Sequence, residues 1–132
     1  MLVYSNILLD VFSEDPVWFE WSSETLAELA ERSVLVVNPI IYAEVSIRFP
    51  RIEDLDEALP ADRFRREELP WEAAFLAGKC YLAYRRHGGE RRSPLPDFYI
   101  GAHAWLQGLQ LLTRDPNRFR RHFPRLPLVT PS

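Results

Sequence analysis

Short apolar runs alternate along the chain with segments of helical periodicity, and this alternation constrains the fold more than any other feature of the sequence. Residues 1–4, 34–37 and 109–113 are compact apolar runs of the kind typical of buried strands. Helix-start signals follow the first two runs, with Ser5 as a cap residue and then Asn38-Pro39. This order predicts an α/β fold with a central, mostly parallel sheet flanked by helices.

Helices are expected in most of the intervening segments. Asp15-Pro16 opens one, residues 52–59 form an acidic amphipathic one, and further helices are expected over residues 96–106 and in a short basic turn before Phe123. Residues 126–129 read as a final edge strand. The longest helix is predicted over residues 70–87, with an apolar face made of Trp71, Ala74, Phe75, Gly78, Tyr81 and Leu82. Because no long linker divides the 132 residues, we expect one domain covering residues 1–132.

Composition excludes several classes of protein. The single cysteine, Cys80, rules out an internal disulfide framework and a cysteine-rich zinc site. No apolar run is long enough to span a membrane, so we expect a soluble, cytoplasmic protein without a membrane partner. Residues 1–66 carry 6 Lys+Arg against 13 Asp+Glu, whereas residues 67–132 carry 10 against 6. This asymmetry fits either a polyanion bound on one face or ordinary scatter in surface composition.

Three carboxylates do not fit on polar helix faces. Glu44 lies within an apolar helical run, Asp97 opens another apolar helix, and Asp115 comes just after an apolar strand. Each lies where a strand end meets the start of a helix or turn, which is where ligand sites form in open α/β sheets. Clustered carboxylates without His or Cys ligands favour Mg²⁺ or Mn²⁺. The alternative is that each carboxylate has only a local role. Asp97 would be a favourable charge in the first turn of its helix, Asp115 a turn residue before Pro116, and Glu44 the partner of an arginine.

Four segments, in this order, resemble the PIN-domain family and, within it, the VapC-like toxins of toxin–antitoxin pairs. They are Ser5-Asn6-Ile7-Leu8-Leu9-Asp10, then Asn38-Pro39-Ile40-Ile41-Tyr42-Ala43-Glu44, then Leu95-Pro96-Asp97-Phe98-Tyr99-Ile100-Gly101-Ala102-His103-Ala104, and finally Leu111-Leu112-Thr113-Arg114-Asp115-Pro116-Asn117-Arg118-Phe119. The resemblance covers essentially the whole chain. It implies a PIN-like three-layer α/β/α fold.

The resemblance also implies an activity. Proteins of this type are small ribonucleases that cut structured RNA, here of the tRNA or rRNA class, and so block translation. By resemblance, Glu44, Asp97 and Asp115 hold Mg²⁺ or Mn²⁺, whose bound water attacks a phosphodiester. Asn6 and Thr113 match positions that support the acids through hydrogen bonds. The implied partners are a VapB-like antitoxin and a second copy of the chain in a homodimer.

Tyr4 departs from the family pattern. The family's first strand normally ends in aspartate before a Ser/Thr-Asn pair, but this chain has Tyr4-Ser5-Asn6. A phenol is neutral near pH 7 and is a poor ligand for Mg²⁺, so we expect an inactive or impaired site. Either Tyr4 is a substitution that silences a toxic nuclease, or it is natural and the protein acts as a binding module for RNA or a protein. A Mg²⁺-dependent phosphatase is a third hypothesis, which the lack of a Gly-rich phosphate loop disfavours.

Basic and aromatic residues suggest where partners bind. Contact with RNA phosphates is predicted for two arginine-rich stretches, represented by Arg85, Arg86, Arg91, Arg92, Arg114 and Arg118. Complementation of helix dipoles together with solubility is the alternative explanation of these charges. Trp18 and Trp21 are expected to form an exposed apolar groove for an antitoxin helix.

Overall fold

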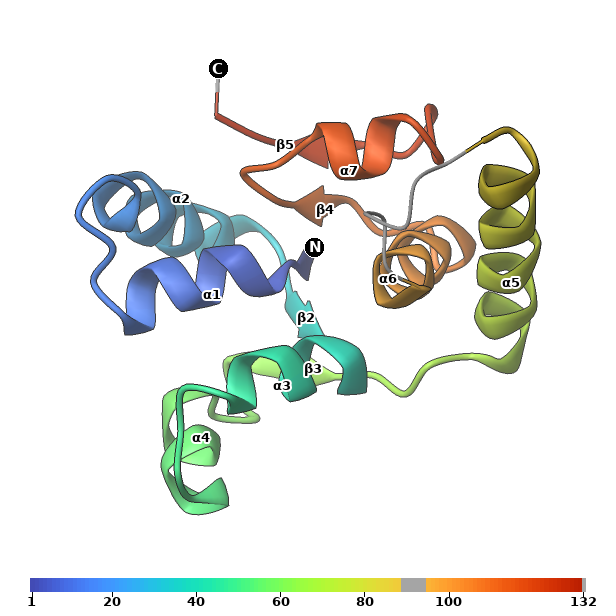
Figure 1. The fold of residues 1–132 in the computed structure, drawn as a ribbon. Helices are drawn as coiled ribbons and strands as arrows, with labels where there is room; N and C mark the ends of the chain where they lie inside the picture. Colours follow the sequence, from blue (N-terminus) through green and yellow to red (C-terminus); the bar gives the residue numbers. More distant parts are fainter. Residues whose placement is uncertain (89–94, 132) are drawn as a thin grey trace.

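A five-stranded parallel sheet lies at the centre of the computed structural model, which describes residues 1–88 and 95–131 (Figure 1). The strand order is β3-β2-β1-β4-β5, and all paired strands within these residues are parallel. The strands are β1 (Leu2–Val3), β2 (Leu35–Val37), β3 (Phe64–Arg66), β4 (Leu111–Leu112) and β5 (Leu128–Val129). The predicted α/β class and parallel sheet are therefore confirmed.

Seven helices within the described residues surround this sheet. They are α1 (Ser5–Phe12), α2 (Phe19–Arg32), α3 (Pro39–Ser46), α4 (Ile52–Ala58), α5 (Trp71–Arg86), α6 (Leu95–Leu106) and α7 (Asn117–Arg120). Figure 1 shows α1 and α2 on one side of the sheet and α5 and α6 on the other, which is the expected three-layer arrangement. No helix in the described part of the chain is long and apolar enough to cross a membrane.

The register of the central strands brings three chain segments to one edge of the sheet. Leu2 pairs with Val36 of β2 and with Leu111 of β4, so β1 lies between them. Because the strands are parallel and in register, the residues that follow β1, β2 and β4 emerge side by side. These residues are Tyr4, Asn38 and Thr113. The carboxyl edge of the sheet thus collects three of the four segments that the sequence singled out, and the fourth opens α6.

Helix-start chemistry is as predicted at one position and differs at two others. Asn38 caps α3, with its side-chain oxygen accepting from the backbone N–H of Ile41 at 2.9 Å. Ser5, in contrast, is the first residue of α1 and makes no cap hydrogen bond. The Asp15 carboxylate accepts from the backbone N–H groups of Val17 and Trp18, in the turn that precedes α2. The predicted cap therefore stabilises this turn, and α2 begins at residue 19.

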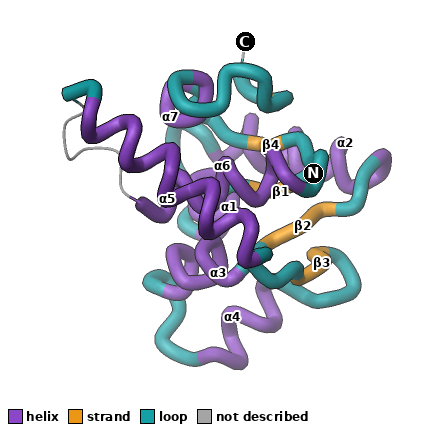
Figure 2. Tube along the Cα trace, turned by 90° about the vertical axis from the view of Figure 1, so that its right-hand side faces the viewer, coloured by secondary structure: helices purple, strands orange, loops and turns teal. Residues whose placement is uncertain are grey.

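The predicted apolar face of α5 is wrong. Trp71 is 89% exposed and Phe75 is 70% exposed, whereas Ala73 and Ala77 are buried. Small residues four positions apart allow α5 to pack closely against α6, which lies behind it in the view of Figure 2. Of the predicted face, Tyr81 does pack inward, with its ring edge-on to Phe98. The error arises because large apolar residues occur on both sides of this helix, and two of them, Trp71 and Phe75, lie outside.

Candidate functional site

Tyr4 and Asp97 are joined by a hydrogen bond although 93 positions separate them in the sequence. Tyr4 follows β1, and Asp97 lies in the first turn of α6. The Tyr4 hydroxyl donates to Oδ1 of Asp97 at 2.8 Å, and both residues are buried. The Tyr4 ring packs edge-on against Phe119, which fixes its direction. Burial and the Asp97 charge raise the pKa of the Tyr4 phenol far above its usual range, so the phenol is neutral at physiological pH.

Arg118 connects Asp97 to Asp115. Its Nη1 donates to Oδ2 of Asp97 at 3.2 Å, and its Nε donates to Oδ2 of Asp115 at 2.7 Å. The same Nη1 donates to the Tyr4 hydroxyl oxygen at 3.5 Å. The hydrogen bond with Asp115 is the largest of the effects that raise the pKa of Arg118, so its guanidinium remains charged. One arginine therefore links two of the three predicted carboxylates.

Glu44 approaches the same place from α3. The Ser5 hydroxyl, next to Tyr4 in the chain, donates to Oε1 of Glu44 at 3.0 Å. Burial raises the pKa of Glu44, and the charge of Asp97 raises it further, while the Ser5 hydrogen bond and the Arg118 charge act in the opposite direction. Glu44 is thus within electrostatic range of Asp97 and Arg118. We call Tyr4, Glu44, Asp97, Asp115 and Arg118 the acidic cluster.

Asn6 and Thr113 support this cluster from α1 and the end of β4. The side-chain nitrogen of Asn6 donates to Oγ1 of Thr113 at 3.4 Å. The same Oγ1 accepts from the backbone N–H of Asp115 at 3.1 Å, which orients the segment carrying that carboxylate. Oδ1 of Asn6 is buried and has no hydrogen-bond partner among the described residues. The predicted supporting residues therefore lie beside the acids, with one acceptor left unsatisfied.

The acidic cluster does not fit a divalent cation in this arrangement. Among the described residues, no three His, Cys, Asp or Glu side chains are grouped in a way that could hold a metal ion. Both oxygens of Asp97 accept hydrogen bonds, from Tyr4 and from Arg118. The Arg118 charge would also repel a cation. Binding of Mg²⁺ or Mn²⁺ by Glu44, Asp97 and Asp115 stays a prediction. In this arrangement it would require the Arg118 side chain to move.

The arginines predicted to contact RNA differ in their surroundings. Nε of Arg114 donates to the buried Asp10 carboxylate at 2.9 Å, and its guanidinium lies over the Trp18 ring. Arg114 and Arg118 are thus engaged with carboxylates within the fold, which the RNA-contact prediction did not foresee. Arg85 and Arg86 occupy exposed positions at the end of α5, and their contact with RNA stays a prediction. Arg91 and Arg92 lie outside the described residues.

The two tryptophans expected to form an exposed groove are half-buried. Trp18 and Trp21 pack edge-on to each other with ring centroids 6.1 Å apart. Trp21 also packs against the core. The Arg114 guanidinium lies over the Trp18 ring and covers part of this surface. The two tryptophans are therefore less exposed than the groove prediction assumed.

A buried hydrogen-bond network that the sequence did not reveal supports the start of α3. The Asn38 side-chain nitrogen donates to Nδ1 of the fully buried His103 at 3.0 Å, because its oxygen already accepts from Ile41. Nε2 of His103 then carries the proton and donates to Glu67 at 3.3 Å. Burial lowers the pKa of His103, so its ring is neutral near pH 7. The Asn-Pro cap signal pointed to Asn38, but nothing local pointed to His103 or Glu67.

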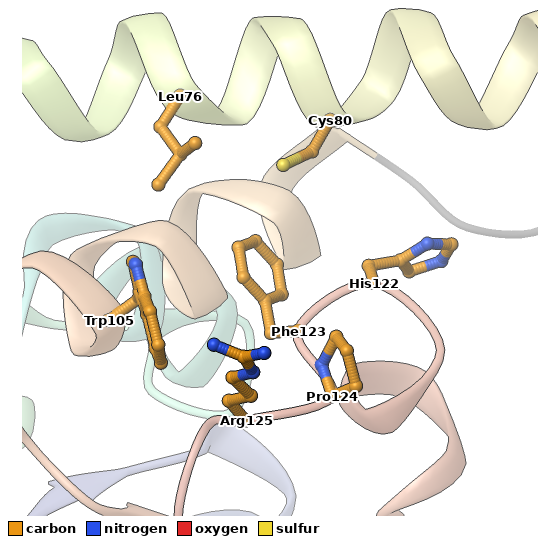
Figure 3. A pocket seen from close by; sticks show the side chains of 7 residues that line it. All are labelled: Leu76, Cys80, Trp105, His122, Phe123, Pro124 and Arg125. Atoms are coloured by element: carbon orange, nitrogen blue, oxygen red, sulfur yellow. The ribbon is translucent and has the colours of Figure 1, made fainter.

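A cavity of about 230 Å³ lies between α5, α6 and the turn after α7. Figure 3 shows Leu76 and Cys80 pointing from α5 toward Phe123. The other residues that line the cavity are Trp105, His122, Pro124 and Arg125. Burial raises the pKa of the Cys80 thiol, so this cysteine is not a reactive thiolate. None of the predicted carboxylates lines the cavity, which is therefore separate from the acidic cluster.

Solved structures of other proteins share the fold of this chain. Solved structures with a similar fold include VapBC2 from Rickettsia felis bound to a promoter DNA fragment, at a TM-score of 0.76 and 19% identity, covering 99% of this chain and 98% of that one. VapBC-1 from nontypeable Haemophilus influenzae has a TM-score of 0.74 and 19% identity, covering 98% and 96%. A toxin–antitoxin complex from Klebsiella pneumoniae has a TM-score of 0.68 and 24% identity, covering 99% and 97%. No curated protein sequence matches the chain.

At these identities the similar structures establish the fold. The family assignment rests on a sequence match, in which the PIN domain model aligns with residues 1–122 and so includes every member of the acidic cluster. The chain therefore belongs to the PIN domain family.

Proposed function

We propose that the chain is the toxin of a toxin–antitoxin pair, similar to VapC toxins, and that structured RNA of the tRNA or rRNA class is its target. PIN domains are generally nucleases, and the similar structures named above are VapBC or toxin–antitoxin complexes. The observation that carries the proposal is the convergence of Glu44, Asp97 and Asp115 from three separate segments at one edge of the sheet. Such a group of acids would suit metal-assisted hydrolysis of a phosphodiester in a form of the cluster from which Arg118 has moved and in which a divalent cation is bound.

Tyr4 makes this chain an impaired nuclease in our proposal. Its phenol stands where the family pattern has a carboxylate, and it remains neutral at physiological pH. It adds no negative charge to the cluster, and its hydroxyl occupies one oxygen of Asp97. Removing a charge about 4 Å from a cation loses up to about 4 kcal/mol of attraction at an effective dielectric of 20. Even a third of that amount corresponds to about a tenfold weaker hold on a cation.

Cleavage of structured RNA by Tyr4→Asp tests this proposal. The unaltered chain, Tyr4→Asp and the matched control Tyr4→Phe are compared with tRNA and rRNA fragments in Mg²⁺ and in Mn²⁺. Tyr4→Phe removes the hydroxyl contact with Asp97 without adding a charge. We expect Tyr4→Asp to gain cleavage of at least about tenfold, and Tyr4→Phe to gain none. Equal rates for all three proteins would contradict the proposed nuclease.

A catalytically silent scaffold that binds RNA or a protein is the second candidate. The observation that favours it is the engagement of Asp97 by both Tyr4 and Arg118. This candidate predicts that the unaltered chain binds structured RNA, and that Arg85→Ala combined with Arg86→Ala weakens the binding. It also predicts no cleavage by Tyr4→Asp. Arg66→Ala, which removes an exposed arginine already paired with Asp56, serves as the matched control.

The proposed partners are a VapB-like antitoxin and a second copy of the chain. The acidic N-terminal half offers charge complementarity to a basic partner segment. Co-expression with a neighbouring antitoxin-like protein, followed by mass measurement in solution, tests both partners. We expect a complex that contains two copies of this chain. A chain that remains monomeric and free of the antitoxin under these conditions would contradict both assignments.

A further inference from the structure

Arg118 holds the central position of the acidic cluster. Its guanidinium contacts Asp97 through Nη1 and Asp115 through Nε, and Nη1 also donates to the Tyr4 hydroxyl. Asp97 is 4% exposed, so its charge has little water to solvate it. Buried carboxylates require a compensating cation, and a planar guanidinium can bridge two of them with separate N–H groups. Arg118 therefore meets the electrostatic need of this cluster from within the chain.

We propose that Arg118 is a built-in cation that takes the place of a divalent ion in the acidic cluster. With Arg118 in position and Tyr4 on Asp97, the unaltered chain does not bind Mg²⁺ or Mn²⁺ there. Withdrawal of the guanidinium leaves the negative charges of Asp97 and Asp115 uncompensated beside Glu44, and a divalent ion then compensates these charges. The proposal concerns the same acidic cluster as the proposed nuclease and deepens that proposal, on which it rests for the identity of the site.

Local geometry allows the guanidinium to be withdrawn. The Arg118 side chain is 47% exposed and Asp115 is 39% exposed, so this pair lies at the mouth of the cluster. Asp97, by contrast, is held by the fold in the first turn of α6. A change at Arg118 therefore alters the charge of the cluster without removing a residue of the buried core.

Arg114 provides a matched control within the same chain. It also pairs with a buried carboxylate, that of Asp10, through Nε at 2.9 Å. Asp10 receives a further hydrogen bond from the Ser22 hydroxyl, so this group of three side chains contains one arginine and a single carboxylate. Loss of Arg114 removes an ion pair comparable to that of Arg118, but at a single carboxylate. Comparison of variants at the two arginines therefore distinguishes a general loss of stability from the loss of a group that takes the place of a divalent ion.

The test uses the full chain, with Mn²⁺ alone as the probe. Calorimetric titration and thermal unfolding are measured for the unaltered chain, Arg118→Gln and Arg114→Gln, with and without Mn²⁺ at constant ionic strength. We expect Arg118→Gln to bind Mn²⁺ at one site and to gain several degrees in Tm when the ion is at about a hundredfold excess over its dissociation constant. The unaltered chain and Arg114→Gln are expected to show neither binding nor a gain in Tm.

Two results would overturn the proposal. One is Mn²⁺ binding by the unaltered chain that is as tight as by Arg118→Gln, and the other is no binding by Arg118→Gln. If Arg118→Gln does not fold, Arg118→Lys carries the same comparison, because one ammonium group cannot reproduce the two-sided bridge. Binding of Mn²⁺ by Arg118→Lys above the unaltered chain supports the proposal, and equal behaviour overturns it. Since no RNA is used, failure here is distinguishable from failure of the Tyr4→Asp cleavage test.

Discussion

Asn38 is the residue at which the fold and the acidic cluster are coupled most directly. Its side-chain oxygen caps α3 at Ile41, and its side-chain nitrogen donates to the buried His103. The capped helix carries Glu44 into the cluster. Replacement of Asn38 by alanine removes both hydrogen bonds at once, so the start of α3 loses its two polar anchors.

The expected loss for Asn38→Ala can be worked from these two contacts. A missing N-cap lowers the free energy of unfolding by about 1 kcal/mol. The unsatisfied Nδ1 of fully buried His103 adds about 1–3 kcal/mol. The sum is about 2–4 kcal/mol, which corresponds to a decrease in Tm of about 10 °C for a chain of this size. Urea unfolding followed by circular dichroism measures the decrease in the free energy of unfolding, and a thermal melt measures the decrease in Tm.

Asn38→Ser is the matched control. Its hydroxyl can still accept from the N–H of Ile41, but it is too short to reach His103. We expect Asn38→Ser to be more stable than Asn38→Ala by about 1 kcal/mol, the value of the cap. Equal stability of the two variants, or a loss for Asn38→Ala below about 0.5 kcal/mol, would refute the role assigned to Asn38.

Three further predictions concern other parts of the fold. Burial lowers the pKa of His103 below its ordinary value of 6.5, so as the pH falls the unfolded chain binds this proton before the folded chain does. The free energy of unfolding should therefore decrease as the pH drops through 6.5. Urea unfolding from pH 8 to pH 5 measures this decrease, which should be smaller in His103→Gln. Arg114→Gln leaves the buried Asp10 carboxylate without its ion pair and should lower the free energy of unfolding by about 2–4 kcal/mol, so an unchanged urea midpoint would count against this account. Trp71→Ser and Phe75→Ser should each change the free energy of unfolding by less than about 0.5 kcal/mol, because both rings are largely exposed; a loss of stability like that of a core residue would restore the original prediction for α5.

Local chemistry explains which parts of the fold could be predicted from the sequence. The run at residues 34–37 and the Asn38-Pro39 cap together define a strand end and a helix start, and the structure has both. The same reasoning located Asp115 just after β4, but it was wrong for Asp97, which lies in the first turn of α6, and the element before α6 in the described part of the chain is helix α5. Strand β3 was missed because Phe64 is its one apolar residue, followed by two exposed arginines. A short edge strand of this composition carries no periodic signal.

The interior of the acidic cluster could be predicted only in part. The spacing of Asp115 and Arg118 favours a local ion pair, because residues three apart lie on one face of a helical turn. The contact of Arg118 with Asp97 spans 21 residues and depends on the packing of α7 beside α6. Sequence therefore identified the carboxylates but not the cation that compensates them. The same limit applies to His103, whose partners Asn38 and Glu67 come from distant segments.

Anomalous diffraction from crystals of the unaltered chain soaked in Mn²⁺ tests the central claim most directly. The account predicts no manganese peak in the acidic cluster, with Arg118 still bridging Asp97 and Asp115. A strong peak between these two carboxylates, with the Arg118 side chain displaced toward solvent, would contradict it.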